Sequence, residues 1–266
     1  MADDGYVEFD DMGLAVAVPR APRRVVSLVP SLTEAIAVSA PGVLAGATTW
    51  CTHPPGLDVP RYRGTKNPDV RAIAAAAPDL VVCNKEENRE LDHRRLRAAG
   101  VPVWVTVVED VPTALRSLRR LFTVALRRPV PAWLSAAAAR LSGPPPATVA
   151  RAAVCVWRDP WMVVGRDTFA GDLLRHVGVE NVYAGDESRY PRVTLEDLRA
   201  APADLIVLPD EPYPFTADDG PPEFPGRARL ATGRHLTWYG PSLADAPAVL
   251  ARQLGVDARR SIPPQS

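Results

Sequence analysis

Short apolar runs rich in branched residues alternate with helix-like stretches along most of this chain. The run at residues 24–29 is β-branched and stops at a proline, which is typical of a buried strand. Ser31 followed by Glu34 forms a capping-box pattern and predicts a helix that continues to about residue 39. The same alternation of strand-like and helix-like stretches predicts strands at residues 43–48, 80–83 and 101–107 and helices at residues 71–77 and 88–99.

The pattern starts again after the three consecutive prolines at residues 144–146. Strands are predicted there at residues 152–156 and 205–208, and helices at residues 168–177 and 195–200. Such alternation is typical of an α/β fold with mostly parallel sheets and helices on their faces. We therefore expect two Rossmann-like lobes with a ligand cleft between them: an N-terminal lobe (1–111), a helical connector (112–143) and a C-terminal lobe (144–266).

Composition narrows the function classes. The chain is 47% hydrophobic and 23% charged, which is ordinary for a globular protein, and its net charge is zero. A balanced charge gives no reason to expect nucleic acid or an anionic membrane as partner, and no apolar run is long enough for membrane insertion. The first six residues are acidic and polar and carry no signal-peptide pattern, so a cytoplasmic monomer is expected.

Candidate binding residues lie in the loops that follow the predicted strands, where open α/β sheets bind ligands. Aromatic residues are only 6% of the chain yet gather in these loops, as walls for an organic ligand or as rings that pin the loops to the core. The chain has two lysines among 31 basic residues, and both fall in these loops. They either contact an anionic group of a ligand, pair with Glu86 and Glu87, or are surface charges. The predicted ligand-binding residues are Ser31, Trp50, His53, Lys66, Lys85, Glu86, Glu87, Trp157, Trp161, Glu211, Tyr213, Phe215, Trp238 and Tyr239.

The sequence assigns no catalytic residue, cofactor or resident metal. Of four histidines only His53 lies clearly in a strand-end loop, where it stays a candidate axial contact to cobalt or iron. Cys51 is two residues away, as a soft ligand or as an inert, half-buried thiol. Three cysteines without a C-x-x-C pair predict neither a disulfide framework nor a zinc site. No nucleophile elbow, phosphate-binding loop or G-x-G-x-x-G motif is present.

Several stretches carry a resemblance to a known family. Residues 24–34, 64–69, 77–81, 100–103 and 204–207 resemble, in this order, the helical-backbone (class III) substrate-binding proteins of ABC importers, of the cobalamin and ferric-siderophore type, with their Fe/B12 periplasmic-binding domain. The resemblance covers roughly residues 20 to 254. It implies a cobalamin-like or iron-chelate ligand, a cleft aromatic at Trp50, and an extracytoplasmic, permease-docked family.

The chain departs from this family where an importer would dock. The resemblance implies an exposed acid on each lobe that pairs with permease arginines; Glu196 keeps it, whereas Arg71 stands at the matching position of the first lobe. A reversed charge weakens symmetric docking, so an ABC permease as partner is in question.

Three hypotheses follow. The first is a small-molecule receptor that binds a cobalamin, siderophore or metal chelate without chemistry. The alternative is a cytoplasmic enzyme on the same scaffold, with Lys66, Lys85, Glu86 and Glu87 as its polar centre. The third is an intracellular carrier or sensor that binds a ligand but has no docking partner.

Overall fold

The computed structural model describes residues 5–257. The start of the predicted N-terminal lobe and the end of the predicted C-terminal lobe lie outside the described residues. Contacts divide the described chain into two compact units. Unit 1 contains residues 5–108, 112–135 and 239–241, and unit 2 contains residues 109–111, 136–238 and 242–257. The division at 111/112 and 143/144 that the sequence suggests stays a prediction.

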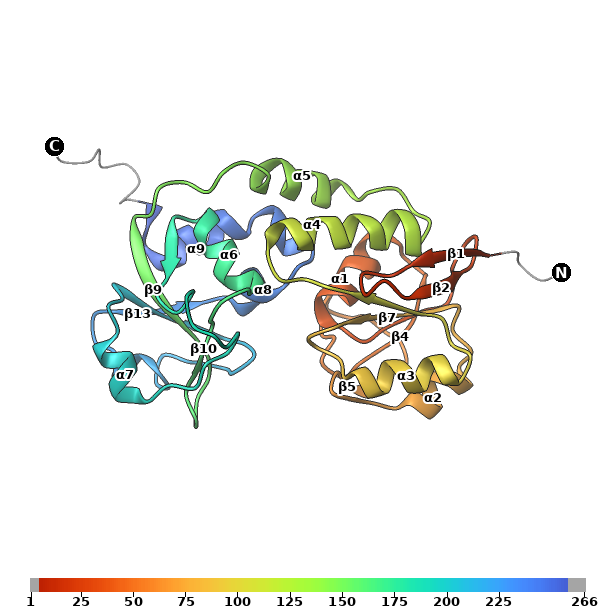
Figure 1. The fold of residues 1–266 in the computed structure, drawn as a ribbon, viewed down its shortest axis with the longest axis horizontal. Coiled ribbons are helices and arrows are strands. Elements are labelled where there is room, and N and C mark those ends of the chain that lie inside the picture. Colours follow the sequence, from red (N-terminus) through yellow and green to blue (C-terminus); the bar gives the residue numbers. More distant parts are fainter. Residues whose placement is uncertain (1–4, 258–266) are drawn as a thin grey trace. The chain divides into compact units, whose positions relative to one another are not determined.

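Unit 1 is built on a four-stranded parallel sheet of order β4-β3-β7-β8. Helix α1 covers one face of this sheet and helices α2 and α3 cover the other (Figure 1). The chain enters through an antiparallel hairpin, β1–β2, and a second small antiparallel pair is β5–β6. The bounds are β1 Tyr6–Phe9, β2 Ala15–Val18, β3 Val25–Ser27, α1 Pro30–Ser39, β4 Leu44–Ala47, β5 Arg63–Gly64, β6 Asn67–Pro68, α2 Val70–Ala75, β7 Leu80–Asn84, α3 Glu90–Ala98 and β8 Val103–Thr106.

Unit 2 repeats the design with a parallel core of β11, β9, β12 and β13 and an antiparallel strand β10 at the edge. Leu198 of α7 packs into an apolar cluster with Ile206 and Leu208 of the central strand β12. The bounds are β9 Ala150–Trp157, β10 Met162–Val163, α6 Phe169–His176, β11 Val179–Asn181, α7 Leu195–Ala200, β12 Leu205–Pro209, β13 Ala228–Ala231, α8 Gly233–Thr237 and α9 Ala246–Leu254, with 3₁₀ turns Pro221–Glu223 and Pro241–Ala244.

The proline-rich middle of the chain is helical and interrupted, as its composition predicts. Helix α4 (Val111–Arg120) continues into one π-helical turn, Leu121–Ala125, and a new helix, α5 (Ala132–Leu141), starts after Pro131. Prolines at 129 and 131 remove backbone donors and so prevent one continuous helix.

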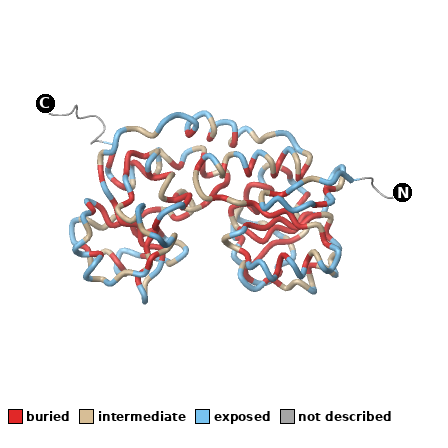
Figure 2. Tube along the Cα trace, viewed as in Figure 1, coloured by how far each residue is buried: buried red, intermediate tan, exposed pale blue. Residues whose placement is uncertain are grey.

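Burial explains why the α/β prediction is correct. Every residue of β3, β7, β8 and β12 is buried, which is the pattern of strands covered on both faces (Figure 2). The predicted capping box is wrong, however. Pro30 takes the first helical position of α1 and Val29 is its N-cap without a side-chain bond, so Ser31 lies inside the helix instead of before it.

Candidate functional site

The strand-end loops of unit 1 converge at one edge of its sheet. Because β3, β4 and β7 are parallel, the loops that leave their carboxyl ends share this edge. The loop after β4 carries Trp50 and His53, and the loop after β7 carries Lys85, Glu86 and Glu87. The turn between β5 and β6 brings Lys66, whose Nζ donates a 2.5 Å hydrogen bond to the backbone oxygen of Glu86.

Two buried asparagines shape this edge. The Asn84 Oδ1 accepts hydrogen bonds from the backbone N–H groups of Glu86 (2.8 Å) and Glu87 (3.2 Å). The Asn88 Oδ1 accepts from the Asn84 N–H, and its Nδ2 donates to the backbone oxygens of Leu28 and Thr65 at 3.1 and 3.0 Å. Neither residue is among those predicted from the sequence, although an asparagine on each side of Lys85-Glu86-Glu87 is a usable signal for a turn.

A carboxyl–phenol pair closes the same edge. The Tyr239 hydroxyl donates a 2.6 Å hydrogen bond to Glu87 Oε1, and residues 239–241 belong to unit 1 although their chain neighbours belong to unit 2. Gly240 lies against Ser31, because a Cβ at this position would come within 3.0 Å of the Ser31 backbone oxygen. Ser31 and Tyr239 are both buried, so they lie beneath the surface that a ligand first meets.

Burial dominates the electrostatics of this pair. It raises the pKa of Glu87 to about 7, while the Tyr239 hydroxyl and the Lys66 charge act in the opposite direction. Burial and the neighbouring Glu87 also raise the pKa of the Tyr239 phenol well above its ordinary value. The Glu87 carboxyl therefore gains or loses its proton near neutral pH, while the Tyr239 phenol keeps its own.

Trp50 is an exposed aromatic residue at the strand-end edge of unit 1. Its side chain is 68% exposed, and its indole Nε1 lies over Gly64, where a Cβ would be only 3.1 Å away. The neighbouring His53 is half-buried, and its Nδ1 lies 3.2 Å from the Thr52 hydroxyl. Cys51 is fully buried between the hydroxyls of Thr33 and Thr48. Within residues 5–257 no three histidine, cysteine or acidic side chains gather as a metal site.

Unit 2 presents an aromatic group at the matching edge of its own sheet. Trp157 ends β9 and is 44% exposed, and its ring meets Tyr213, from the loop after β12, edge-on with centroids 5.6 Å apart. Beneath them Trp161 stacks on Phe215 at 5.9 Å. Trp161 and Phe215 are buried, so of the two interpretations left open for these rings the structure shows packing.

A polar network that the sequence analysis missed surrounds these rings. Arg158 forms ion pairs with Asp219 and Glu223, and the Tyr213 hydroxyl donates to Asp219 Oδ2 at 2.6 Å. Residues 158 and 219 lie 61 positions apart, so no local spacing pattern connects them.

The remaining predicted residues lie elsewhere in their units. Trp238 is buried, and Glu211 is half-buried against Gly233, where a Cβ would come within 2.3 Å of the Glu211 side chain. The structure thus groups Ser31, Trp50, Lys66, Glu86, Glu87 and Tyr239 in unit 1 and Trp157, Trp161, Tyr213 and Phe215 in unit 2. The ligand cleft shared by both groups stays a prediction.

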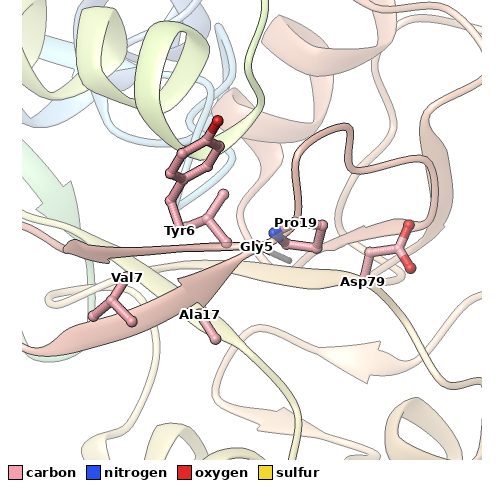
Figure 3. A pocket seen from close by; sticks show the side chains of 7 residues that line it. Gly5, Tyr6, Val7, Ala17, Pro19 and Asp79 are labelled. Carbon is pink, nitrogen blue, oxygen red and sulfur yellow. The ribbon is translucent and has the colours of Figure 1, made fainter. Parts of the chain in front are cut away.

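A hollow of about 260 Å³ lies away from these residues. It is formed by the β1–β2 hairpin, with Tyr6, Val7 and Ala17 among its walls, and by Asp79, which precedes β7 (Figure 3). Because Asp79 stands at the amino end of its strand, this hollow opens at the edge opposite to the strand-end loops. None of the predicted binding residues lines it.

Known proteins match this chain in fold and, weakly, in sequence. No family model matches. The vitamin B12-binding protein of Salmonella choleraesuis is 26% identical over 197 residues, 70% of this chain and 71% of that protein. The solved periplasmic vitamin B12 binding protein BtuF of Vibrio cholerae has a TM-score of 0.72 at 17% identity, covering 91% of this chain and 99% of that one.

Other solved structures extend the match to different ligands. A periplasmic heme binding protein from Pseudomonas aeruginosa has a TM-score of 0.71 at 23% identity, covering 92% of this chain and 95% of that one. The molybdate periplasmic binding protein MolA of Haemophilus influenzae has a TM-score of 0.75 at 14% identity, covering 97% and 93%. These matches share a fold and differ in what they bind.

The comparisons correct the predicted location. A cytoplasmic protein was expected from the absence of a signal pattern, but the matching structures are described as periplasmic, so that expectation is wrong. Within the described part of the chain, no helix is both long and apolar enough to cross a membrane. The predicted resemblance is confirmed: this chain has the two-unit α/β fold of the periplasmic substrate-binding proteins of ABC importers for cobalamin, heme and metal compounds.

Proposed function

We propose that this protein binds a bulky organic or organometallic compound of the cobalamin or heme class, without chemistry. The observation that carries the proposal is the pair of exposed tryptophans, Trp50 and Trp157, each at the carboxyl edge of a parallel sheet and each held by its neighbours. Large flat rings offer apolar contact area at little cost in conformational entropy, which suits a macrocyclic ligand. The names of the matching proteins support the same ligand class.

The polar residues of unit 1 support binding over catalysis. The Lys66 side chain is bonded to the Glu86 backbone and the Glu87 side chain to Tyr239, so two of the four residues of the alternative enzyme centre hold the loops. The raised pKa of Glu87 favours the enzyme alternative, because perturbed carboxyls mark sites of proton transfer as well as buried structural pairs. Chemical conversion of the ligand separates the two: binding without chemistry predicts that the parent returns its ligand unchanged, whereas an enzyme predicts conversion by the parent that Glu87→Gln loses.

A permease partner is the finer part of the proposal. Glu196 is exposed on α7 and supplies one of the two acids that the resemblance implies. Arg71 is exposed on α2 and presents the opposite charge, which disfavours docking onto a second arginine. Glu196→Arg is therefore expected to weaken capture by an importer while leaving ligand affinity unchanged.

Titration with cyanocobalamin and with hemin tests the ligand class. We expect one of the two to bind with micromolar affinity or better, and Trp50→Ala and Trp157→Ala to weaken it by about tenfold or more, about 1.4 kcal/mol or more each. Phe9→Ala, which removes an exposed ring from the hairpin, is the matched control and should bind like the parent. Failure of both compounds to bind, or unchanged affinity in both tryptophan variants, would contradict the proposal.

A further inference from the structure

The exposed Trp157 ring packs against Tyr213. Their ring centroids are 5.6 Å apart and their planes meet at 79°, an edge-to-face contact. Such contacts have a preferred geometry because the positive edge of one ring faces the negative face of the other. A displacement of Tyr213 would therefore change the orientation of Trp157.

Tyr213 is itself held at both ends. Its ring lies 4.6 Å from that of Phe215, which is buried and stacked on Trp161. Its hydroxyl donates a 2.6 Å hydrogen bond to Asp219 Oδ2, and this bond is the main reason that the pKa of the Tyr213 phenol is raised. The hydroxyl end of the ring thus depends on one carboxylate.

The second carboxylate oxygen of Asp219 bonds to the residue next to Trp157. Asp219 Oδ1 accepts a hydrogen bond from Nη1 of Arg158, the residue that follows Trp157. The Arg158 guanidinium also lies over the Trp161 ring at 5.4 Å and contacts Glu223 at 3.4 Å. Hydrogen bonds that involve ionised groups are roughly twice as strong as neutral ones. The Asp219 carboxylate accepts one from Arg158 and one from Tyr213, so it links the loop after β9 to the loop after β12.

We infer that Asp219 is a positioning residue of the ligand face, which sets the orientation of Trp157 through Tyr213 and Arg158. The inference rests on the proposed function for the role of Trp157, and it assigns Asp219 no ligand contact of its own. A purely structural role for Asp219, which is to hold its proline-rich loop in place, differs from the positioning role in one testable respect. It predicts lower stability of Asp219 variants without a change at the Trp157 ring.

The first experiment needs no ligand. The near-ultraviolet circular dichroism of Trp157 is obtained as the difference between the parent and Trp157→Phe. We expect Asp219→Ala and Tyr213→Phe to lose most of this difference band, because the ring is no longer fixed against Tyr213. Glu180→Ala, which removes an acid of a surface ion pair elsewhere in unit 2, should keep it. An unchanged band in both variants would overturn the inference.

The second experiment measures coupling with cyanocobalamin, or with hemin where that is the compound bound. Asp219→Ala should weaken binding by about tenfold in the parent and should have no further effect when Trp157 is alanine, since the two act in series. An equal loss in both backgrounds would show that Asp219 acts independently of Trp157, and the inference would be wrong. If neither compound binds the parent, the proposed function fails, while the spectroscopic experiment still decides the positioning role.

The melting temperature and far-ultraviolet spectrum identify variants that fold. Should Asp219→Ala fail to fold, Asp219→Asn keeps the size of the side chain and weakens the bond to Arg158, and Tyr213→Phe leaves Asp219 in place. Either of these folded variants with a parental Trp157 band and parental affinity would overturn the inference.

Discussion

At Glu87, burial and hydrogen bonding act in opposite directions on one proton. Burial is the larger effect and raises the pKa of this carboxyl to about 7, although Tyr239 and Lys66 favour its charged form. The partly buried Glu86 adds to the rise through like-charge repulsion. The folded protein therefore binds this proton more tightly than the unfolded chain does.

The pH dependence of stability follows from this difference. The pKa of Glu87 in the folded protein lies above the ordinary value of 4.5. The contribution of the protonated Glu87 carboxyl to the free energy of unfolding is therefore fully present below pH 4.5 and is lost as the pH rises through about 7. Glu87→Gln lacks this titration, so its free energy of unfolding should fall less over that range than that of the parent. Urea unfolding at a series of pH values measures it, with Glu180→Gln as control; parallel profiles for the parent and Glu87→Gln would contradict the prediction.

The cysteines give a second prediction at the same scale. Cys51, Cys83 and Cys155 are buried and unpaired, and burial raises the pKa of each thiol, that of Cys155 to about 12. Thiolate is the reactive form, so we expect no reaction with Ellman's reagent in the native protein and reaction of all three thiols in denaturant. Rapid labelling of Cys51 in the native state would show that the loop after β4 opens.

At the scale of elements, the sequence predicts helices and strands that show a repeating pattern of apolar residues. It misses elements and element ends that depend on a single residue or contact. Helix α7, Leu195–Ala200, matches its predicted range, and in the structure a local Thr194–Asp197 capping box fixes its start. The capping box predicted at Ser31 is wrong because the N-cap of this helix is Val29, two residues earlier, and Pro30 is its first residue. The strands β5, β6 and β10 were not predicted, since two residues are too few to show a period of two.

The candidate site follows the same rule. Strand-end placement predicts that Lys66 lies beside Glu86, because the carboxyl ends of parallel strands meet at one edge. It does not predict Asn88 or Asp219, whose partners are 60 and 61 residues away along the chain. Long-range polar contacts carry no periodic signal, so only the folded structure reveals them.

The turn between β5 and β6 gives a prediction for an element. A Cβ at Gly64 would come within 2.6 Å of Asn67 Oδ1 and 3.1 Å of the Trp50 indole nitrogen, distances that require a shift. Gly64→Ala should displace Trp50, shift its fluorescence and weaken ligand binding. Gly185→Ala, where nothing lies within 4 Å, should leave both unchanged. Parental fluorescence and affinity in Gly64→Ala would show that Trp50 is not held by this turn.

At the scale of the whole molecule, ligand binding is expected to raise the stability of folding. A compound that binds only the native protein stabilises it by about 2.7 kcal/mol at one hundred times its dissociation constant. Thermal unfolding with increasing cyanocobalamin or hemin should therefore move to higher temperature in proportion to the logarithm of ligand concentration. The shift should shrink in Trp50→Ala at equal concentration, and a constant melting temperature for both compounds would contradict it.

The membership of residues 239–241 in unit 1 has a consequence for biosynthesis. The phenol that closes over Glu87 is 152 residues downstream, so a ribosome has made the strands of both sheets before it emerges. Until then the nascent N-terminal sheet lacks that partner, and closing so long a loop is slow. A chain stalled before Trp238 should therefore leave Glu87 accessible to water and the strand-end edge sensitive to proteases. Synthesis of residues 239–241 thus completes the first unit only after the strands of both sheets have been translated.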